Sequence, residues 1–436
     1  MRDWIDSLDR KVFPFVEYPG YASRYPALSG ISLPREKCKE LREASRCLFA
    51  IFSKACQVAR RGDDRFFRAM DIPEHIRPYL SIPNPFSVPT WLSRFDFVLD
   101  NEGQFHMVEL NADTPCAVVE AYYGNGVYCR HFHKEDPNAG AYDKLKGFLL
   151  RIHQEGFRAS ADLKTAKLVA SRPFVFSCFP DYIEDYGTTM FLMHAMQEAV
   201  SETHPMVPAE ESIRFASFYD LQVDKDIGAC LLPDGTQAGA LYRLHPMELL
   251  VEERAGDGYP IGTRLLDGYA DSRFLLFNPP EAVLMQSKAF LALVWSLMLD
   301  GRFFTKEEAR IIRKYLPASY FSMDDAPKEK DRVKPLIHKP VWGREGVGIF
   351  VTEKGERILR KEVPDADDVV RRDSSHDMVQ EFIQQKRGSV LADDGQLEGY
   401  LTLSCFMLMN EPSALYARFS EHPVAGTEAY WVPLCY

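Results

Sequence analysis

At 436 residues the chain is too long for a single hydrophobic core of ordinary size, so two or three domains are expected. Its 46% hydrophobic and 26% charged residues are typical of a soluble globular protein. The net charge of -11 argues against a nucleic acid as the main partner, because binding to a polyanion depends on concentrated Lys and Arg.

The cysteines and the apolar segments bear on the cellular compartment. None of the nine cysteines forms a C-x-x-C pair, so there is neither a zinc signature nor a disulfide framework. Residues 1–13 lack the apolar core of a signal peptide. The longest apolar run, residues 289–299, is far too short to span a bilayer. We therefore expect a cytoplasmic protein with no membrane partner, and the oligomeric state stays open.

The first long element predicted along the chain is a helix at residues 35–60. Apolar side chains recur there at helical spacing after Pro34, which suits the start of a helix. We expect this helix to pack on the first domain.

A β-hairpin is predicted at residues 94–111, because two β-branched and aromatic segments flank a turn. Alternation puts Arg94 with Asp96 on one face of the first strand, and Glu109 with Asn111 on one face of the second. Either register that a short turn allows places both pairs on the same face. The opposite face is predicted to enter a core and carries Phe95, Phe97, Leu99, Val108 and Leu110.

The polar face of this hairpin suggests a cation site. Two carboxylates and an amide oxygen form an incomplete shell for Mg2+, which takes oxygen ligands and completes them with water and substrate phosphates. The alternative is a solvated hairpin face on which Arg94 merely pairs with an acid.

A helix is predicted at residues 114–123, directly after the hairpin. Asp113 and Thr114 are candidates for its N-terminal cap, and Pro115 suits its first turn. The backbone N–H groups of such an end suit an anionic ligand beside Asn111. An ordinary helix cap is the alternative.

A β-α-β unit is predicted next, from a strand, a helix and a strand at residues 173–178, 183–200 and 213–218. Between its first strand and its helix lie Asp181, Glu184 and Asp185, at the carboxyl end of a strand where open α/β sheets bind ligands. These acids could hold a cationic amine. They could equally complement the dipole of the helix that follows.

A helix that carries Lys288 is predicted from Glu281 onward. Farther along, a strand ends in Lys339, and a loop with three glycines, residues 340–348, leads into another strand. Glycines let backbone N–H groups approach phosphate oxygens, and a lysine adds a point charge. The pattern is neither a P-loop nor a dinucleotide fingerprint, and a plain glycine turn is the alternative. If the loop covers a nucleotide, we expect it to be mobile before the nucleotide binds.

Residues 379–383 form an apolar strand that turns polar at Gln380 and Glu381. Such a segment suits a backbone that meets the edge of an adenine. An edge strand is the alternative explanation.

These segments together resemble the ATP-grasp ligases and, among them, the synthetase domain of the glutathionylspermidine synthase family. The resemblance covers the chain from about residue 90 to 436 and rests on Arg94-Phe-Asp96, Glu109-Leu-Asn111-Ala-Asp113-Thr-Pro, Lys339-Pro, Gly343-Arg344-Glu345-Gly346, Val379-Gln380-Glu381-Phe382 and Trp431-Val-Pro433. The Glu-x-Asn-Ala-Asp-Thr-Pro segment precedes the glycine loop, as in the permuted order of that family. The amidase domain of its bifunctional members has no counterpart here, so amide hydrolysis is not expected.

The resemblance implies an α/β (α+β) ATP-grasp fold in permuted order, with antiparallel sheets and a β-α-β substrate-binding domain. It implies three regions: residues 1–165 with the metal-binding hairpin, residues 166–280 for the acceptor, and residues 281–436 for ATP. It also implies an ATP-dependent carboxylate–amine ligase that uses Mg2+ and joins a small-molecule acid to a small-molecule amine.

The resemblance assigns roles to particular residues. The metal ligands would be Asp96, Glu109 and Asn111, and Arg94 would steady the transferred phosphoryl group or the tetrahedral oxyanion. The nucleotide would contact Lys288, Lys339, Gly343, Gly346, Gln380, Glu381 and Arg418. The substrates would contact Asp113, Thr114, Glu184 and Asp185, of which the last two fall near the polyamine site of that family.

In such a ligase, ATP converts a carboxylate into an acyl phosphate, which an amine then attacks. Two other functions stay open. A kinase would need similar nucleotide machinery with a different acceptor, and a non-catalytic binding module could keep the fold alone. The resemblance does not fix which acid and amine are joined.

Overall fold

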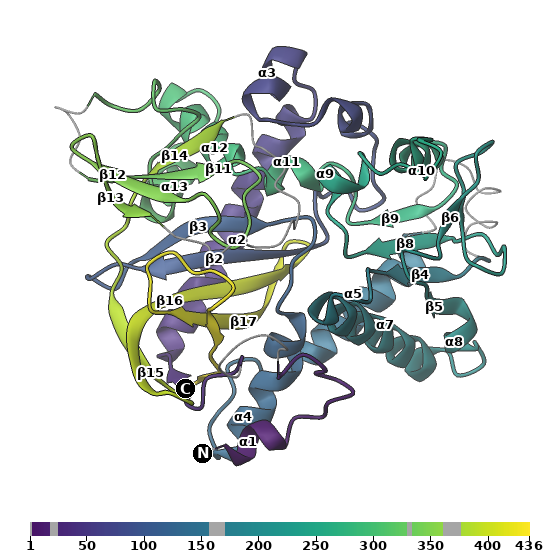
Figure 1. Ribbon diagram of the computed structural model, residues 1–436, viewed down its shortest axis with the longest axis horizontal. Helices are drawn as coiled ribbons and strands as arrows, with labels where there is room; N and C mark the ends of the chain where they lie inside the picture. Colours follow the sequence, from purple (N-terminus) through teal and green to yellow (C-terminus); the bar gives the residue numbers. More distant parts are fainter. Residues whose placement is uncertain (1, 18–24, 157–170, 329–333, 361–375) are drawn as a thin grey trace.

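The computed structural model describes residues 2–17, 25–156, 171–328, 334–360 and 376–436. At its centre is a six-stranded antiparallel sheet that joins the early hairpin to strands from the end of the sequence (Figure 1). The strands run in the order β18-β17-β16-β2-β3, with β15 paired to β16. They are β2 (Leu92–Leu99), β3 (Phe105–Asn111), β15 (Arg387–Ala392), β16 (Gly395–Leu408), β17 (Glu411–Ser420) and β18 (Tyr430–Trp431).

The predicted hairpin and its shared polar face are confirmed. Arg94 pairs with Asn111, and Asp96 pairs with Glu109. Directly paired residues of an antiparallel ladder point to the same face, so the four polar side chains lie together.

A bulge in β3 changes the register beyond this point. Phe97 pairs with Met107, so Val108 is an extra residue between the two registers. Val108 is half-buried, whereas Phe105 and Met107 are fully buried in the core. The prediction that Val108 enters the core is therefore wrong, because the bulge shifts the register so that Met107 occupies that position in the core.

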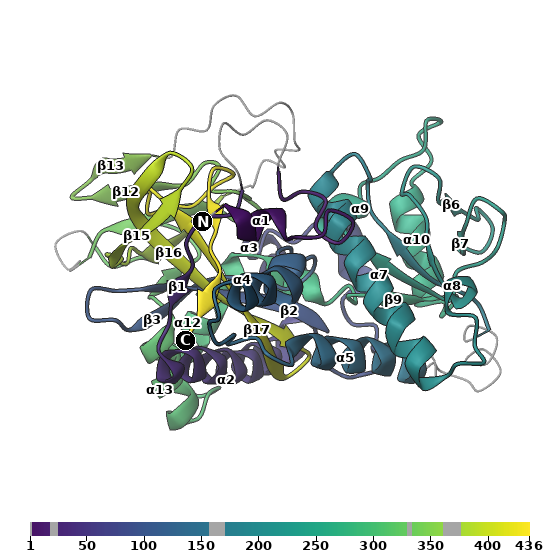
Figure 2. The same ribbon diagram turned by 90° about the horizontal axis from the view of Figure 1, so that it is seen from below.

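The apolar face of the central sheet is covered by α2 (Arg35–Ala59), which confirms the predicted helix. Figure 2 shows α2 lying along one side of the central strands. Its Phe52 meets Phe95 of β2 edge-on, with ring centroids 5.9 Å apart. The helix thus packs on the apolar face of the sheet and leaves the polar face to other parts of the protein.

A second antiparallel sheet carries the glycine loop. Its order is β10-β14-β11-β12-β13. The strands are β10 (Ser319–Tyr320), β11 (Leu336–Pro340), β12 (Phe350–Glu353), β13 (Glu356–Arg360) and β14 (Asp377–Glu381). Lys339 is therefore the last residue but one of β11, which leads into the loop, so the predicted strand extends one residue farther than expected.

The helices beside this sheet are α11 (Ala282–Gln286), α12 (Ala289–Asp300) and α13 (Lys306–Tyr315). The continuous helix predicted from Glu281 is wrong, because Ser287 adopts an extended conformation between α11 and α12. Lys288 is thus the residue before α12 and not a residue inside a helix.

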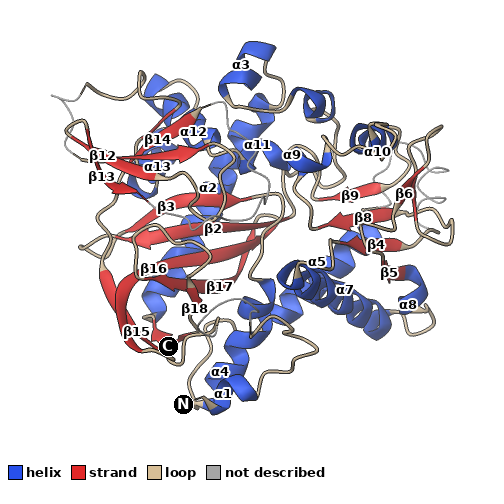
Figure 3. Ribbon diagram, in the orientation of Figure 1, coloured by secondary structure: helices blue, strands red, loops and turns tan. Residues whose placement is uncertain are grey.

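The third sheet is parallel and has the order β5-β4-β8-β9 (Figure 3). Its strands are β4 (Phe174–Ser177), β5 (Ile213–Phe215), β8 (Ala240–Arg243) and β9 (Leu275–Phe277). The helices around it are α5 (Ala141–Glu155), α7 (Ile183–Thr203), α8 (Ala209–Ser212), α9 (Met247–Leu250) and α10 (Ile261–Ala270). The β4-α7-β5 segment confirms the predicted β-α-β unit. The mixed α/β fold class is confirmed as well, whereas the three domain boundaries stay a prediction.

The helix predicted directly after the hairpin starts later than expected. Ala117 has a positive φ of 70°, and only then does the chain enter a π-helical turn, Glu120–Gly124, and α4 (Asn125–His131). Asp113 does not cap a helix because its carboxylate is bound by Arg243 of β8.

The two ends of the sequence meet below the central sheet in Figure 1. There β1 (Ile31–Ser32) pairs in parallel with β19 (Leu434–Cys435), and Trp4 of α1 (Asp3–Asp6) packs on Trp431. The remaining elements are α3 (Asp64–Ala69), a 3-10 helix (Glu74–Tyr79), β6 (Gln222–Val223) and β7 (Cys230–Leu231). Among the described helices, none is long and apolar enough to cross a membrane.

Candidate active site

The polar face of the β2–β3 hairpin forms one hydrogen-bonded group. Arg94 donates from Nε and NH2 to the two carboxylate oxygens of Asp96, at 2.8 and 2.9 Å. Asn111 donates from Nδ2 to Asp96 Oδ2 at 3.4 Å, and Arg418 of β17 lies 3.7 Å from the same oxygen. Asp96 is fully buried, so its charge is balanced inside the protein by the two arginines.

Glu109 lies beside this group and faces a lysine. Its Oε1 is 3.1 Å from Nζ of Lys288. Burial would raise the pKa of Glu109, but Lys288 and then Arg418 outweigh it and lower that pKa to about 2. The carboxylate is therefore ionised across the physiological range.

Lys339 approaches from the second sheet and binds two acceptors. Its Nζ donates to Gln380 Oε1 at 2.8 Å and to the carbonyl of Val108 at 3.0 Å. The bulge that moves Val108 out of the core thus presents a carbonyl to the lysine. Burial lowers the pKa of Lys339 to about 8, although Glu109 acts in the opposite direction.

Gln380 and Glu381 face different surroundings. Gln380 is buried and donates from Nε2 to Ser319 Oγ at 2.9 Å, so its side chain belongs to the lysine cluster. The Glu381 carboxylate lies 3.5 Å from Lys334, and its backbone N–H donates to the Ala318 carbonyl at 2.8 Å. The structure brings Gln380 into the site and places the Glu381 side chain at its margin.

The glycine loop lies over this cluster and reaches the parallel sheet. Lys288 Nζ donates to the carbonyl of Gly343 at 2.5 Å, and Arg344 forms an ion pair with Glu248 of α9. Gly346 has a φ of 72°, a conformation that a side chain would strain. The loop of the second sheet therefore contacts Lys288, which pairs with Glu109 of the central sheet, and α9 beside the parallel sheet.

Two acids of α7, Glu184 and Asp185, lie near charged side chains of the central sheet and of the glycine loop. Burial, and then the charge of Glu345, raise the pKa of Glu184 to about 7, against the opposing effect of Arg94 and Arg418. Burial and Glu184 raise the pKa of Asp185 to about 7 as well. Both acids stand in the first turn of α7, where they complement the helix dipole. This position is also compatible with a bound ligand, so both explanations stay open.

Asp113 is bound within the protein. Arg243 donates to its two carboxylate oxygens at 2.5 and 2.9 Å, and the backbone N–H of Met247 donates to Oδ2 at 2.8 Å. Thr114 next to it is half-buried, and two residues later the Cys116 carbonyl accepts a hydrogen bond from Arg94 at 2.7 Å. Substrate roles for Asp113 and Thr114 stay predictions.

Sequence reasoning missed two amide side chains that hold the hairpin. Asn278 is buried and binds the backbone at both ends of the hairpin, accepting from Trp91 N at 2.8 Å and donating to the Asp113 carbonyl at 2.7 Å. Gln286 Oε1 accepts from the N–H of Ala112 at 2.8 Å. Neither amide stands in a local motif, so no signal in the sequence could have pointed to them.

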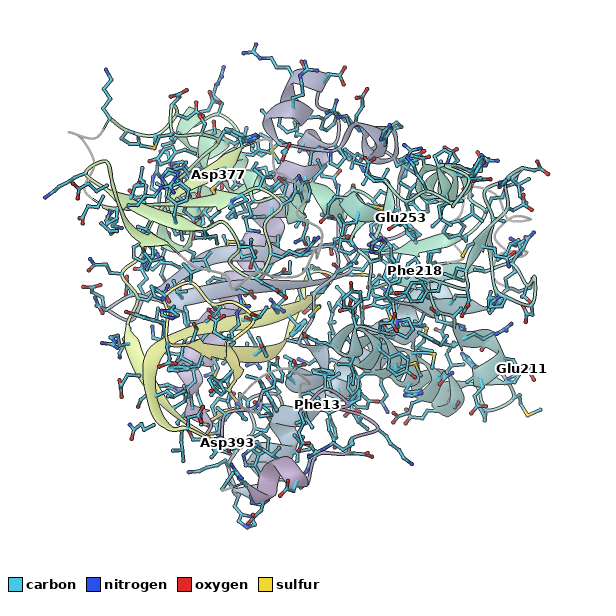
Figure 4. The ribbon with its side chains drawn as sticks, viewed as in Figure 1. Phe13, Glu211, Phe218, Glu253, Asp377 and Asp393 are labelled. Atoms are coloured by element: carbon cyan, nitrogen blue, oxygen red, sulfur yellow. The ribbon has the colours of Figure 1, made fainter. Side chains whose placement is uncertain are left out.

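The carboxyl ends of the parallel strands point toward the central sheet, as the contact between Arg243 and Asp113 shows. At this end His245 contacts Glu253 at 3.0 Å and stacks edge-on with Phe218. Figure 4 labels Phe218 and Glu253 on the side of the parallel sheet that faces the hairpin. A ligand held at Glu184 would therefore lie between two sheets.

The donor set of the hairpin is of the kind that Mg2+ takes, and the metal site itself stays a prediction. In the described part of the chain, no group of three or more His, Cys, Asp or Glu side chains could hold a metal ion. The hairpin offers two carboxylates and one amide oxygen, from Asp96, Glu109 and Asn111. Mg2+ commonly takes one or two carboxylates and completes its coordination shell with water and phosphate oxygens. It therefore needs fewer protein ligands than a metal ion that is held by side chains alone.

A hollow of about 700 Å3 lies elsewhere, between α4, α5 and α7. Tyr122, Tyr142 and Phe191 line it together with Arg130 and Lys134. It contains none of the predicted site residues.

Three sheets of mixed direction, with a glycine loop over a cluster of lysines and acids, define a protein with a glutathione synthetase-like fold. A solved structure of a glutathione synthetase-like effector from Globodera pallida matches the whole chain and 94% of its own length, with a TM-score of 0.56 and 11% identity. The model of the glutathionylspermidine synthase preATP-grasp family matches residues 2–436. The chain belongs to the glutathionylspermidine synthase family.

Two curated relatives have related descriptions. A putative acid–amine ligase of Haemophilus influenzae is 25% identical over 62% of this chain and 57% of its own. The bifunctional glutathionylspermidine synthetase/amidase of Escherichia coli is 22% identical over 82% of this chain and 53% of its own. The chain thus spans about half the length of the curated relatives it matches.

Proposed function

We propose that the protein is an ATP-dependent carboxylate–amine ligase that forms an amide through an acyl phosphate. The observation that carries the proposal is the position of Lys288. Its ammonium binds Glu109 on the predicted metal face and the Gly343 carbonyl of the loop. One cation therefore links the metal ligand to the phosphate-binding loop, as transfer of a phosphoryl group from ATP would need.

The side chains divide the reaction between them. Lys288 and Lys339 would neutralise the nucleotide phosphates, and Arg94 would hold the carboxylate that receives the phosphoryl group. Mg2+ bound at the hairpin would add positive charge to the phosphates. Activation is required because a carboxylate has too poor a leaving group to react with an amine, and these contacts act mainly by positioning and charge neutralisation.

The acceptor is proposed to be a cationic amine. Arg94 and Arg418 act on Glu184, Arg344 acts on Asp185, and the pKa of each acid is raised to about 7. An ammonium group placed between the acids would favour their ionised forms. Because the Escherichia coli relative is described as a glutathionylspermidine synthetase, glutathione and spermidine are the first pair to test.

Trapping with hydroxylamine tests the reaction class. The purified protein is incubated with Mg-ATP and hydroxylamine and with single acids, including γ-glutamyl peptides, while ADP, phosphate and hydroxamate are measured. A ligase yields ADP, free phosphate and a hydroxamate that depends on the acid. A kinase yields ADP and a stable phosphorylated acceptor without hydroxamate, and a binding module yields none of these.

The variant Glu109→Gln tests whether the reaction takes place at the hairpin. It removes the charge of one proposed metal ligand and keeps the side-chain volume, so we expect a loss of roughly 100-fold or more in kcat without unfolding. Glu411→Gln is the matched control, since Glu411 is exposed at the start of β17. Full activity of Glu109→Gln would move the catalytic centre away from the hairpin.

A further inference from the structure

A buried acid near the site has no part in the function proposed above. Glu120 stands in the π-helical turn and has no exposed surface. Its Oε1 accepts a hydrogen bond from Tyr25 at 2.6 Å, and its Oε2 has no hydrogen-bond partner among the described residues. A buried carboxylate without a cation in contact is costly, and π-helical turns are frequent at functional sites.

Tyr25 connects Glu120 to the central sheet. Its hydroxyl lies 3.3 Å from the hydroxyl of Tyr416, on β17. Tyr416 pairs with Ser404 of β16, and Ser404 pairs with Asp96 of β2, so Tyr416 stands on the polar face of the sheet.

The far end of this chain of hydroxyls meets the proposed reaction centre. The guanidinium of Arg94 lies 5.6 Å from the centre of the Tyr416 ring. Hydrogen bonds thus run from the polar face, through two tyrosines, to an enclosed carboxyl group.

Titratable side chains from α7, from β2 and from the segment at Tyr25 act on Glu120. Burial, and then the charge of Glu184, raise its pKa to about 8, while the bond from Tyr25 and the charge of Arg94 lower it. Tyr416 faces Arg94 and Arg418, and Cys116 faces Glu120 as well. A carboxyl group that titrates near the working pH can both take up and release a proton.

The proposed reaction needs such a group. When an alkylammonium forms an amide, its nitrogen loses two protons as the C–N bond forms and the bond from carbon to the phosphate oxygen breaks. One proton leaves with the phosphate as hydrogen phosphate, and the other requires a base.

We propose that Tyr416, Tyr25 and Glu120 are the proton relay that serves the acceptor amine, an inference that rests on the proposed ligase function. The amine gives a proton to Tyr416, Tyr416 gives its own to Tyr25, and Tyr25 gives its own to Oε1 of Glu120. Both tyrosines end neutral, Glu120 ends protonated, and the proton returns to water after the product leaves. Glu120 acts only through the two hydroxyls.

The test compares two acceptors with glutathione as the acid. Spermidine is protonated at neutral pH and needs the relay, whereas hydroxylamine is largely unprotonated and does not. Glu120→Gln and Tyr25→Phe should lower the rate of amide formation roughly 100-fold, with hydroxamate formation within about twofold of wild type. Tyr123→Phe is the matched control, because the Tyr123 hydroxyl accepts a hydrogen bond from the backbone N–H of Asp9 and stands outside the proposed relay. Equal losses with both acceptors, or no loss with either, would overturn the relay.

A second measurement does not depend on the substrates. Infrared spectra across pH should show a carboxyl band in the wild type that titrates near pH 8 and is missing in Glu120→Gln. Tyr25→Phe should raise that midpoint, since the lost hydrogen bond favours the ionised form. If the wild type forms no hydroxamate with any acid, the proposed ligase function is refuted. The titration of Glu120 still tests the hydrogen-bonded group of Tyr416, Tyr25 and Glu120 in that case. A Glu120 band that titrates in the ordinary carboxyl range would refute the relay by itself.

Discussion

Lys339 carries a charge that depends on pH because it is enclosed. Burial lowers its pKa to about 8, while Glu109 favours its charged form. Above this pH the unliganded protein therefore holds a neutral lysine at the place proposed for nucleotide phosphates. A bound polyphosphate would raise the pKa again, since an opposite charge favours the ammonium form.

We expect binding of Mg-ADP above pH 8 to take up a proton. Titration calorimetry in buffers with different ionisation enthalpies measures this uptake directly. Lys339→Met should abolish it, and Lys334→Met should leave it unchanged because Lys334 is half exposed beside Glu381. An undiminished uptake in Lys339→Met would assign the proton to another group.

The ion pair between Asp113 and Arg243 should matter greatly for stability. Both side chains are almost completely buried, and replacing Asp113 with Ala leaves an unpaired guanidinium inside the protein. We expect the free energy of unfolding to fall by about 3–5 kcal/mol in urea denaturation. Glu307→Ala breaks an exposed pair with Arg310 and should leave the free energy of unfolding almost unchanged. Similar losses in the two variants would show that the buried pair does not join the sheets.

At the scale of elements, the sequence pattern predicted those features that depend on local backbone geometry, such as the hairpin. The hairpin follows from the two-residue period of strands, which makes Asp96 and Glu109 neighbours in either register. The errors arise where a tertiary contact overrides the local preference. The bulge turns the Val108 carbonyl to Lys339, and Arg243 draws Asp113 away from the helix that follows.

The glycine loop is expected to respond to nucleotide as a unit. Its contacts through Gly343 and Arg344 tie it to Lys288 and Glu248, so a ligand beneath it should strengthen its closed arrangement. Backbone amide exchange in residues 342–348 should slow when Mg-ATP is added, while α13 exchanges at an unchanged rate. Arg344→Ala should reduce the added protection. Unchanged exchange at saturating nucleotide would exclude the loop from binding.

At the scale of the whole molecule, the sequence could not predict which distant side chains meet. Tyr25, Glu120 and Tyr416 come from separate parts of the chain, and no spacing relates them. The same holds for Asn278, which follows β9 directly and reaches the hairpin from there. Such contacts depend on how the sheets pack, and packing is decided by summed apolar burial and not by any short pattern.

The acids of α7 make stability depend on pH. Glu184 and Asp185 have pKa values of about 7, above the ordinary carboxyl range, so between about pH 5 and 7 the folded protein binds protons that the unfolded chain has released. The free energy of unfolding should therefore fall as pH rises through this window. It should stay lowered above it.

Replacing both acids with their amides should remove this dependence. At pH 8.5 the variant Glu184→Gln/Asp185→Asn should be more stable than the wild type by several kcal/mol, and at pH 4 the two should be alike. Glu211→Gln is the control, because Glu211 is exposed at the outer edge of the parallel-sheet region (Figure 4). A constant difference at both pH values would mean that the acids act through something other than protonation.

The strand order of the central sheet has a consequence for how the protein is made. Strand β2 lies between β3 and β16, and residues 112–394 are synthesised after the hairpin and before β16 leaves the ribosome. During that time all four strands of the parallel sheet, which lie within residues 174–277, leave the ribosome. The hairpin must wait with one edge unpaired, which is an exposed template for wrong pairing. In the nascent chain Arg94 and Asp96 are therefore present long before Arg418 is synthesised. We expect that a chaperone bound during synthesis would cover the unpaired edge of β2, because the site does not yet exist.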